Sequence, residues 1–159
     1  MDLCRYLADY VEEQRDHWAQ NGLQIVLEST LDRAPVRMDR GQFARVLDNL
    51  LSNSWKYKTE KTGKACFRLT SSGLGRVRLE LADNGSGVAP DQLDRIFESF
   101  YRTDRARSHV AAGSGLGLAV VRKIVETMKG KIWAEANEPQ GLKICMEFSL
   151  EESNQCKRS

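Results

Sequence analysis

The chain has 159 residues, a length typical of one domain that buries an apolar core without help from disulfides or metal. Hydrophobic residues make up 41% and charged residues 29%, which indicates a folded globular protein and excludes an intrinsically disordered one. The net charge is +2 and no basic run is present, so we expect no nucleic-acid partner.

Cysteine usage and hydropathy bear on the compartment. The four cysteines show no C-x-x-C spacing and only two histidines accompany them, which favours free thiols in a reducing cytoplasm. No apolar stretch approaches the roughly 18 residues that a membrane helix needs. The start MDLCRYLADYVEEQRD lacks the apolar core of a signal peptide. We expect a cytoplasmic piece that does not contact the membrane; a membrane-anchored parent would carry its anchor outside this chain.

The first third of the chain predicts a helix, two strands and a second helix. Apolar residues recur at helical spacing over residues 2–20, ending near Asn21 and Gly22. LQIVLEST (23–30) predicts a strand, and APVRMD (34–39) a short second one broken by a proline. Asp39 is a suitable N-cap for a helix over about 40–58. The apolar face of that helix follows an i, i+3, i+4, i+7, i+8 pattern: Phe43, Val46, Leu47, Leu50 and Leu51.

The middle of the chain predicts a hairpin and a short helix. ACFRLTSS (65–72) and GRVRLELAD (75–83) alternate as strands do, and SSGLG between them favours a tight turn. Pro90 suits the first turn of a short helical segment over 90–97. The stretch 101–115 has little periodicity and predicts a mobile loop.

The last part predicts a helix followed by a hairpin. GLGLAVVRKIVETMKG (115–130) has helical periodicity, with Gly130 as the C-cap. KIWAEAN and LKICMEFSLE predict two strands around the turn EPQG. We therefore expect one α+β domain over residues 1–152, with helices covering one face of a mostly antiparallel sheet, and a flexible polar tail over 153–159.

A polar stripe runs along the second predicted helix. Asn49, Asn53 and Lys56 stand at i, i+4 and i+7, so they share one side of the helix beside its apolar face. Carboxamide oxygens suit a hard cation such as Mg²⁺, and an ammonium group can neutralise phosphate charge. Taken alone, the stripe also fits an ordinary solvated helix face.

Three further motifs follow in order. DNGSGV (83–88) places an acidic residue at the end of a predicted strand, although a plain Asx-Gly turn has the same composition. IFESFYR (96–102) carries Phe97, Phe100 and Tyr101 as anchors for a loop, or simply as core residues. GSGLGL (113–118) opens a helix with glycines, which lets phosphates approach main-chain N–H groups. Its spacing is not that of a dinucleotide fingerprint.

The four motifs together, in this order, closely resemble the catalytic, ATP-binding domain of bacterial sensor histidine kinases. This domain is part of the GHKL group, which also includes gyrase, the ninety-kilodalton heat-shock chaperone and the mismatch-repair ATPases. NLLSNSWKY matches the N box, DNGSGV the first glycine box, IFESFYR the F box and GSGLGL the second glycine box. The resemblance covers essentially the whole chain. It implies a two-layer α/β sandwich of the Bergerat type, with about five strands, about three main helices on one face and a mobile ATP lid.

The resemblance implies how the base of ATP is held. The aspartate of the first glycine box, here Asp83, accepts a hydrogen bond from the exocyclic amine of adenine. A carboxylate there discriminates against guanine, which presents an oxygen acceptor at that place. The residues implied to lie along the base, the ribose or the nearby chain are Tyr57, Gly85, Gly87, Val88 and Tyr101.

The resemblance also implies the phosphate end of the site. It implies that Asn53 is the magnesium ligand and that the catalytic residues are Asn49, Lys56 and Arg102. Asn49 would support the metal or the phosphates, Lys56 would contact phosphate, and Arg102 would approach the γ-phosphate. The residues implied to hold the phosphates at the helix start are Gly113, Gly115, Leu116, Gly117 and Leu118. The stretch between Arg102 and Gly113 corresponds to the ATP lid.

Asn49 separates this branch from its relatives. Gyrase-type ATPases carry a glutamate four residues before the magnesium asparagine, where it is a general base, and an asparagine cannot take that role at neutral pH. The pattern implies a domain that binds Mg·ATP and donates the γ-phosphate to a histidine on a separate dimerisation domain, with a response-regulator receiver downstream. Neither His17 nor His109 lies in the H-E motif of such an acceptor. We expect the piece to be monomeric in isolation.

Some residues depart from the family pattern. Ala112 stands where many members have a further glycine, and Met128, Lys129 and Gly130 replace the common His-Gly-Gly. Ser54 and Trp55 stand where alanine and a small aliphatic residue are more usual, and the last strand lacks the usual Gly-Thr. The alternative function is a non-catalytic nucleotide-binding regulatory module, which only a phosphorylation assay would distinguish.

Overall fold

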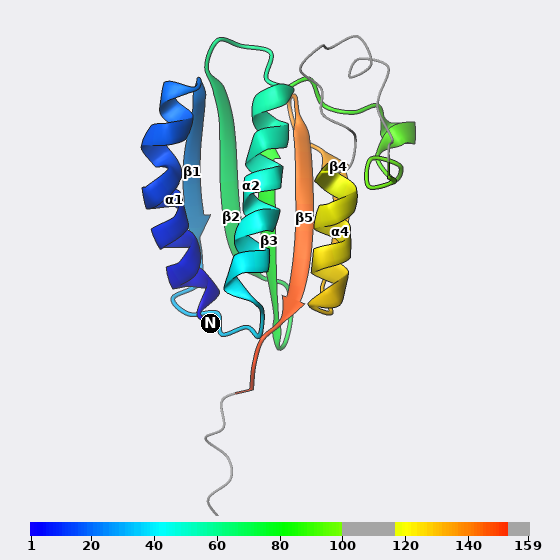
Figure 1. Cartoon of the computed structure of the whole chain (residues 1–159). Helices are drawn as coiled ribbons and strands as arrows, with labels where there is room; N and C mark the ends of the chain where they lie inside the picture. Colours follow the sequence, from blue (N-terminus) through cyan, green and yellow to red (C-terminus); the bar gives the residue numbers. More distant parts are fainter. Residues whose placement is uncertain (100–116, 153–159) are drawn as a thin grey trace, which may run out of the picture.

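The computed structural model describes residues 1–99 and 117–152, and its five strands form one sheet. The strands are β1 (Leu23–Ser29), β2 (Gly63–Ser71), β3 (Arg76–Asp83), β4 (Lys131–Ala136) and β5 (Leu142–Ser149). Their order across the sheet is β1-β2-β3-β5-β4 (Figure 1). Only β1 and β2 pair in parallel, and the other neighbours are antiparallel. The predicted mixed, mostly antiparallel sheet is confirmed.

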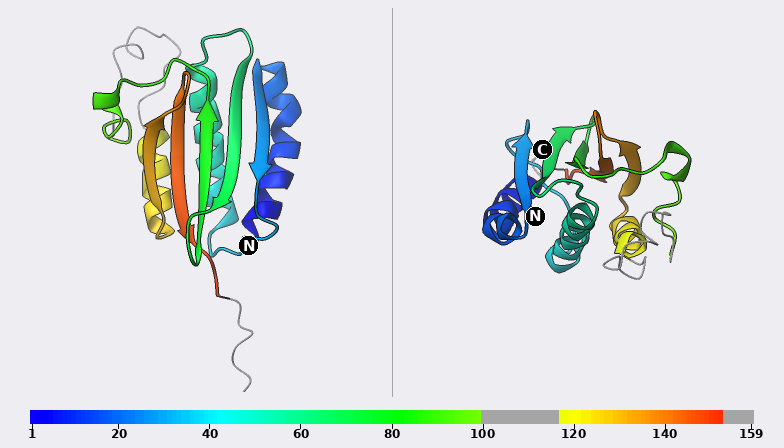
Figure 2. Two further views of the ribbon diagram at one scale, coloured as in Figure 1. Left: turned by 180° about the vertical axis from the view of Figure 1, so that it is seen from behind. Right: turned by 90° about the horizontal axis from the view of Figure 1, so that it is seen from above.

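The three main helices all cover the same face of this sheet. They are α1 (Leu3–Gln20), α2 (Arg40–Lys56) and α4 (Gly117–Thr127), and the view from above in Figure 2 shows them in one layer beside the sheet. Alternate strand residues point into the core between the layers, such as Phe67, Leu79 and Met146, which are fully buried. The predicted apolar face of α2 is also buried there. The α+β two-layer sandwich is therefore confirmed.

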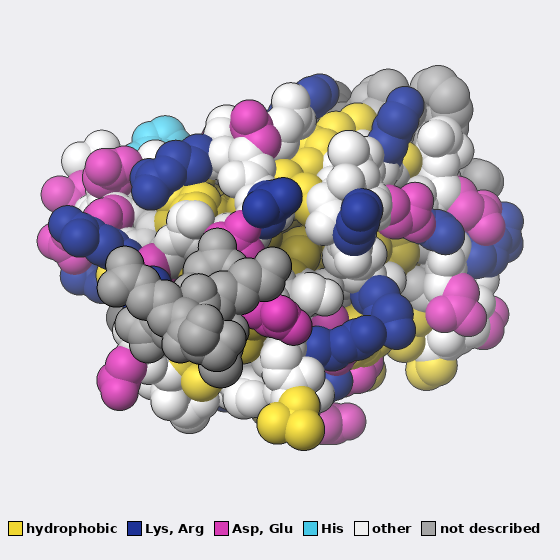
Figure 3. Space-filling model, turned by 90° about the horizontal axis from the view of Figure 1, so that it is seen from below, with side chains coloured by type: hydrophobic (Ala, Val, Ile, Leu, Met, Phe, Trp, Pro, Cys, Tyr) yellow, Lys and Arg dark blue, Asp and Glu magenta, His cyan; other side chains and the backbone are white. Residues whose placement is uncertain are grey.

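The chain runs up and down between two ends of the sandwich. Four parts of the chain consequently lie at the same end of the molecule, the upper end in Figure 1: the C-termini of α2 and β3, the β4–β5 hairpin and the start of α4. The opposite end holds the N-terminus and the β2–β3 hairpin. Seen from below, that lower end carries basic and acidic side chains side by side (Figure 3).

The short strand predicted over 34–39 is wrong. The segment forms only an isolated bridge between Asp2 and Pro35 and does not join the sheet. Its main chain pairs with the start of the chain instead: Leu3 N donates to Ala34 O at 2.8 Å and Val36 N to Met1 O at 2.8 Å. The same place holds the N-cap of α1, where Asp2 Oδ1 accepts from Cys4 N at 3.1 Å. Pro35 has no N–H to donate to a ladder, so its residue pair with Asp2 stays an isolated bridge.

The helix boundaries follow from their caps. Asp39 caps α2 as predicted, its carboxylate accepting from Gln42 N at 2.8 Å. The helix ends at Lys56 with Tyr57 as C-cap, slightly before the predicted end. Residues 90–97 are not one helix: a 3₁₀ helix, η1 (Pro90–Gln92), is followed by turns. Ile96 and Phe97 are nevertheless buried in the core. The other two predicted anchors, Phe100 and Tyr101, lie outside the described residues.

The C-terminal end of α4 differs from the prediction that Gly130 is its cap. The residue in the left-handed conformation is Lys129, with φ 61°. Gly130 N donates to Val125 O and Lys129 N to Glu126 O, both at 2.9 Å, which is the hydrogen-bond pattern of a Schellman motif one residue earlier. Gly130 is needed for space, because a Cβ there would lie 2.7 Å from Cε1 of Phe148.

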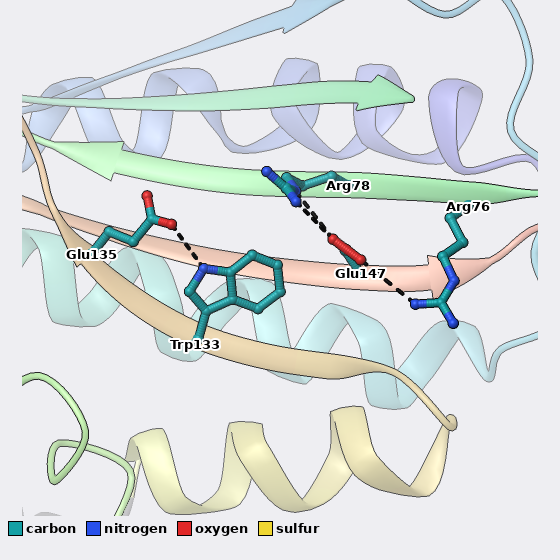
Figure 4. A network of polar contacts seen from close by, with 5 residues as sticks. All are labelled: Arg76, Arg78, Trp133, Glu135 and Glu147. Carbon is teal, nitrogen blue, oxygen red and sulfur yellow. Dashed lines mark hydrogen bonds and ion pairs between the residues drawn. The ribbon is translucent and has the colours of Figure 1, made fainter. Parts of the chain in front are cut away.

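The other face of the sheet carries no described helix, and polar pairs line it (Figure 4). Arg78 Nη2 donates to Glu147 Oε2 at 2.8 Å, and the Arg78 guanidinium lies 5.1 Å from the centre of the Trp133 ring. Trp133 Nε1 donates to Glu135 Oε1 at 2.9 Å. These pairs join side chains of the strands β3, β5 and β4, so charged groups cover this face of the sheet.

Several predictions fall outside the described residues. They are the mobile lid, the beginning of the helix predicted from residue 115 and the tail over 153–159. In the described parts of the chain, no helix is both long enough and apolar enough to span a membrane.

Candidate functional site: a buried aspartate at the end of β3

Asp83 ends β3 with its carboxylate turned into the sandwich, and only 7% of the residue is exposed. Its Oδ1 accepts hydrogen bonds from Gly85 N at 2.9 Å and Leu142 N at 3.1 Å. Its Oδ2 accepts from Ser54 Oγ at 3.1 Å, a hydroxyl that α2 contributes. The carboxylate is therefore held by its own turn and by two segments distant in sequence, β5 through its main chain and α2 through a side chain.

The electrostatics of Asp83 are dominated by its burial. Removal from water raises the pKa of this carboxyl above its usual value, and the hydrogen bonds from Gly85, Leu142 and Ser54 oppose that rise. All three partners donate hydrogen bonds to Asp83, so they suit the ionised carboxylate, which can only accept. The arrangement is a buried acceptor whose geometry is fixed by the backbone.

The turn after Asp83 is fixed against α2 and β2. Asn84 Oδ1 accepts from Lys64 N at 2.8 Å, and Ser86 N donates to Tyr57 O at 2.9 Å. Gly85 is required by this close approach, because a Cβ there would lie 2.6 Å from Tyr57 O. Gly87 adopts φ 68°, a conformation that favours glycine. The structure thus brings Tyr57 beside the DNGSGV motif, and their joint role in one site stays a prediction.

The β4–β5 hairpin forms the other support of this turn. Asn137 Nδ2 donates to Asp83 O at 2.8 Å, and Gln140 Nε2 donates to Gly85 O at 2.8 Å. Gly141, at φ 117°, packs directly on the main chain of Asp83. The sequence reasoning missed Asn137, Gln140 and the Leu142 amide. The only signal available was the turn-like EPQG, which says nothing about what the turn packs against.

The predicted magnesium and phosphate residues lie at the same end of the molecule on α2. Asn49 and Asn53 are one helical turn apart, and Lys56 is the last residue of the helix; all three are partly exposed. Over residues 1–99 and 117–152, no hydrogen bond or ion pair engages their side chains. In those same ranges no group of three or more His, Cys, Asp or Glu side chains is placed to hold a metal ion.

The remaining predicted site residues divide into two groups. Gly117 is the first described residue of α4, and the side chains of Val88 and Leu118 pack against the core. The others lie outside the described residues: Tyr101, Arg102, Gly113, Gly115 and Leu116. His17 is exposed on α1, its ring against Trp18, and His109 lies outside the described residues.

A family comparison places this arrangement in a class of proteins. Residues 38–152 match the model of the family described as "Histidine kinase-, DNA gyrase B-, and HSP90-like ATPase". The matched range contains α2, the Asp83 turn, α4 and the last hairpin, and so every described part of the site. The class is that of ATP-binding domains built on this sandwich.

Two curated relatives narrow the assignment. BaeS of Escherichia coli strain K12, a signal transduction histidine-protein kinase, is 38% identical over 86% of this chain and 29% of its own length. The sensor protein kinase WalK of Staphylococcus haemolyticus is 33% identical over 86% of this chain and 22% of its own length. The chain thus spans less than a third of either relative.

The solved structure of full-length ShkA in complex with AMPPNP has the same fold. It superposes with a TM-score of 0.78 at 28% sequence identity, over 96% of this chain and 31% of that one. The chain therefore belongs to the histidine kinase-, DNA gyrase B- and HSP90-like ATPase family, as the ATP-binding catalytic domain of a two-component sensor histidine kinase.

Proposed function

We propose that this chain binds Mg·ATP at the end of the sandwich that holds Asp83 and donates the γ-phosphate to a histidine on a separate dimerisation domain. The observation that carries the proposal is the buried, hydrogen-bonded carboxylate of Asp83. A carboxylate held in place by two amides and a hydroxyl suits the exocyclic amine of adenine. The amine donates a hydrogen bond, and an ionised carboxylate accepts one. The likeness to ShkA, whose structure contains the ATP analogue AMPPNP, supports this nucleotide class.

The phosphate end of the proposed site rests on α2. The donor chemistry of Asn49 and Asn53 fits Mg²⁺, which prefers oxygen ligands and is usually shared with substrate phosphates. In this proposal Asn53 holds the metal, Asn49 supports it and Lys56 contacts phosphate. The bound metal would neutralise phosphate charge. In this proposal the phosphates are enclosed by further residues: Arg102, Gly113, Gly115, Leu116 and Gly117.

The chemistry required of this chain is alignment and charge neutralisation, which dominate phosphoryl transfer. Asn49 has no basic oxygen for activating water, so slow hydrolysis of ATP by the isolated domain follows. The phosphoacceptor histidine then belongs to the dimerisation domain of the parent protein, and a response-regulator receiver domain is the next acceptor. In this proposal the parent kinase works in the cytoplasm and dimerises through that other domain, so the piece itself is monomeric.

The test is phosphorylation in trans. The chain is incubated with Mg²⁺, γ-labelled ATP and the purified dimerisation domain of its parent, and the expected result is acid-labile label on that domain. Asp83→Asn is the control and should give none. ATP binding without any transfer would overturn the kinase proposal and favour a regulatory nucleotide-binding module, and absence of ATP binding would overturn both.

A further inference from the structure

Ser54 is a buried polar residue of α2, and the helix itself does not need a hydroxyl at this position. It is 3% exposed, and it lies on the side of the helix that faces the end of β3. A serine inside a helix commonly returns its hydroxyl to the carbonyl one turn earlier. Here the hydroxyl leaves the helix and donates to Asp83 Oδ2 at 3.1 Å. Alanine would suit the helix at this position but would lack the hydroxyl and its bond to Asp83.

The two oxygens of Asp83 are held differently. Oδ1 accepts from two main-chain amides, which can only donate. Oδ2 has Ser54 as its hydrogen-bond partner among the described residues, and a hydroxyl can either donate or accept. Oδ2 is therefore the oxygen with capacity left for a ligand, and its hydrogen-bonding character depends on Ser54.

We infer that Ser54 is a positioning residue that keeps Oδ2 of Asp83 an acceptor and thereby makes the site prefer a base with an amine over a base with a carbonyl at the same place. The inference rests on the proposed function, since it concerns the base that Asp83 contacts. A base with a carbonyl there, such as hypoxanthine or guanine, needs a donor on Oδ2. That donor exists only when Asp83 is protonated.

The surroundings of Asp83 explain why the Ser54 hydroxyl influences the protonation of this carboxyl. The elements packed against the carboxylate are α2, the 84–87 turn, β2 and the β4–β5 hairpin. The charged residues within two positions of their contacts with Asp83 are Lys56, Lys64, Glu135, Glu138 and Lys143. None of these contributes to the pKa of Asp83, which burial raises and the amides and the Ser54 hydroxyl lower. Removing the hydroxyl takes away one of three opposing groups, so protonation begins at higher pH.

The experiment compares Ser54→Ala with Ser52→Ala, a matched change on the same helix whose side chain has no hydrogen bond to Asp83. Calorimetry gives Kd for Mg·ATP and for Mg·ITP, which differs from ATP by a carbonyl in place of the amine, from pH 5 to pH 8. For Ser54→Ala we expect the preference for ATP to fall about tenfold, the usual effect of losing one hydrogen bond to a charged group. The pH below which ATP binding weakens should also rise.

A second readout does not need nucleotide. The carboxyl carbon of Asp83 is followed by NMR in a pH titration of the free protein, and its midpoint should move to higher pH in Ser54→Ala but not in Ser52→Ala. An unchanged ATP/ITP ratio or an unchanged midpoint in Ser54→Ala would overturn the inference. If wild-type protein binds no ATP, the proposed function fails, and the NMR titration still decides whether Ser54 controls Asp83.

Discussion

Gly141 lies directly against the main chain of Asp83, so closely that a Cβ built on Gly141 would overlap the carbonyl oxygen of Asp83. Next to this contact, the Leu142 amide donates to the Asp83 carboxylate and Asn137 donates to the Asp83 carbonyl. The end of β3 and the β4–β5 hairpin are thus one structural unit. The geometry of the Asp83 carboxylate depends on a loop that carries none of the four sequence motifs.

Gly141→Ala should damage this unit severely. The substitution adds a clash with Asp83 to the strain of φ 117°, and we expect a loss of about 3 kcal/mol or more in the free energy of unfolding. Gly73→Ala is the matched control, since Gly73 has φ 125° and an added Cβ there would meet nothing within 4 Å, and it should cost about 1 kcal/mol. Urea denaturation measures both, and equal losses would contradict the steric argument.

Asp83→Asn should separate binding from folding. An asparagine oxygen can accept from the Gly85 and Leu142 amides while its nitrogen donates to Ser54, so the fold keeps its hydrogen bonds. The side chain then offers the adenine amine no acceptor. We expect calorimetry to detect no ATP binding and the melting temperature without ligand to be unchanged or higher. Retained binding at wild-type affinity would contradict the role given to Asp83.

The pH dependence of stability provides another check on Asp83. Because burial raises the pKa of this carboxyl in the folded state, its contribution to stability is greatest below the pKa of the unfolded chain and is lost as the pH rises through the folded pKa. Wild type should therefore lose stability relative to Asp83→Asn between acidic and neutral pH. Urea unfolding of both proteins at several pH values measures the difference, and a difference of opposite sign would contradict it.

Lys129→Gly should stabilise the end of α4. Lys129 is in the left-handed conformation at φ 61°, which costs a residue with a side chain about 1 kcal/mol relative to glycine. We expect a comparable gain in the free energy of unfolding. Gly130→Ala should do the opposite, because its Cβ would lie 2.7 Å from the Phe148 ring. If Gly130→Ala were the neutral change and Lys129→Gly the harmful one, the cap assignment would be wrong.

Asn53→Ala should weaken ATP binding mainly when magnesium is present. The proposed role of Asn53 is to hold the metal, so the loss in Mg²⁺ is expected to be about tenfold or more in Kd. In EDTA the variant and wild type should bind ATP with similar, weaker affinity. Equal losses with and without the metal would remove the metal role from Asn53.

Local patterns predicted much of the fold, and the site residues stay a prediction, although the structure brings Tyr57 next to the Asp83 turn. The apolar spacing of α2, its Asp39 cap and the strand alternation each depend on neighbouring residues, and all are present. The contacts of Ser54, Asn137 and Gln140 were not predicted, because each joins segments far apart in sequence. Lys129 took the left-handed cap position against its own preference, because Phe148 fixes where Gly130 must lie.

The sheet order has a consequence for synthesis of the protein. Chains emerge from the ribosome N-terminus first, yet β5 is inserted between β3 and β4 and delivers the Leu142 amide to Asp83. A nascent chain that has released only β3 and α4 still has an open sheet edge and an incompletely held carboxylate. If Asp83 holds the base as proposed, nucleotide can assist folding of this domain only after β5 has left the exit tunnel.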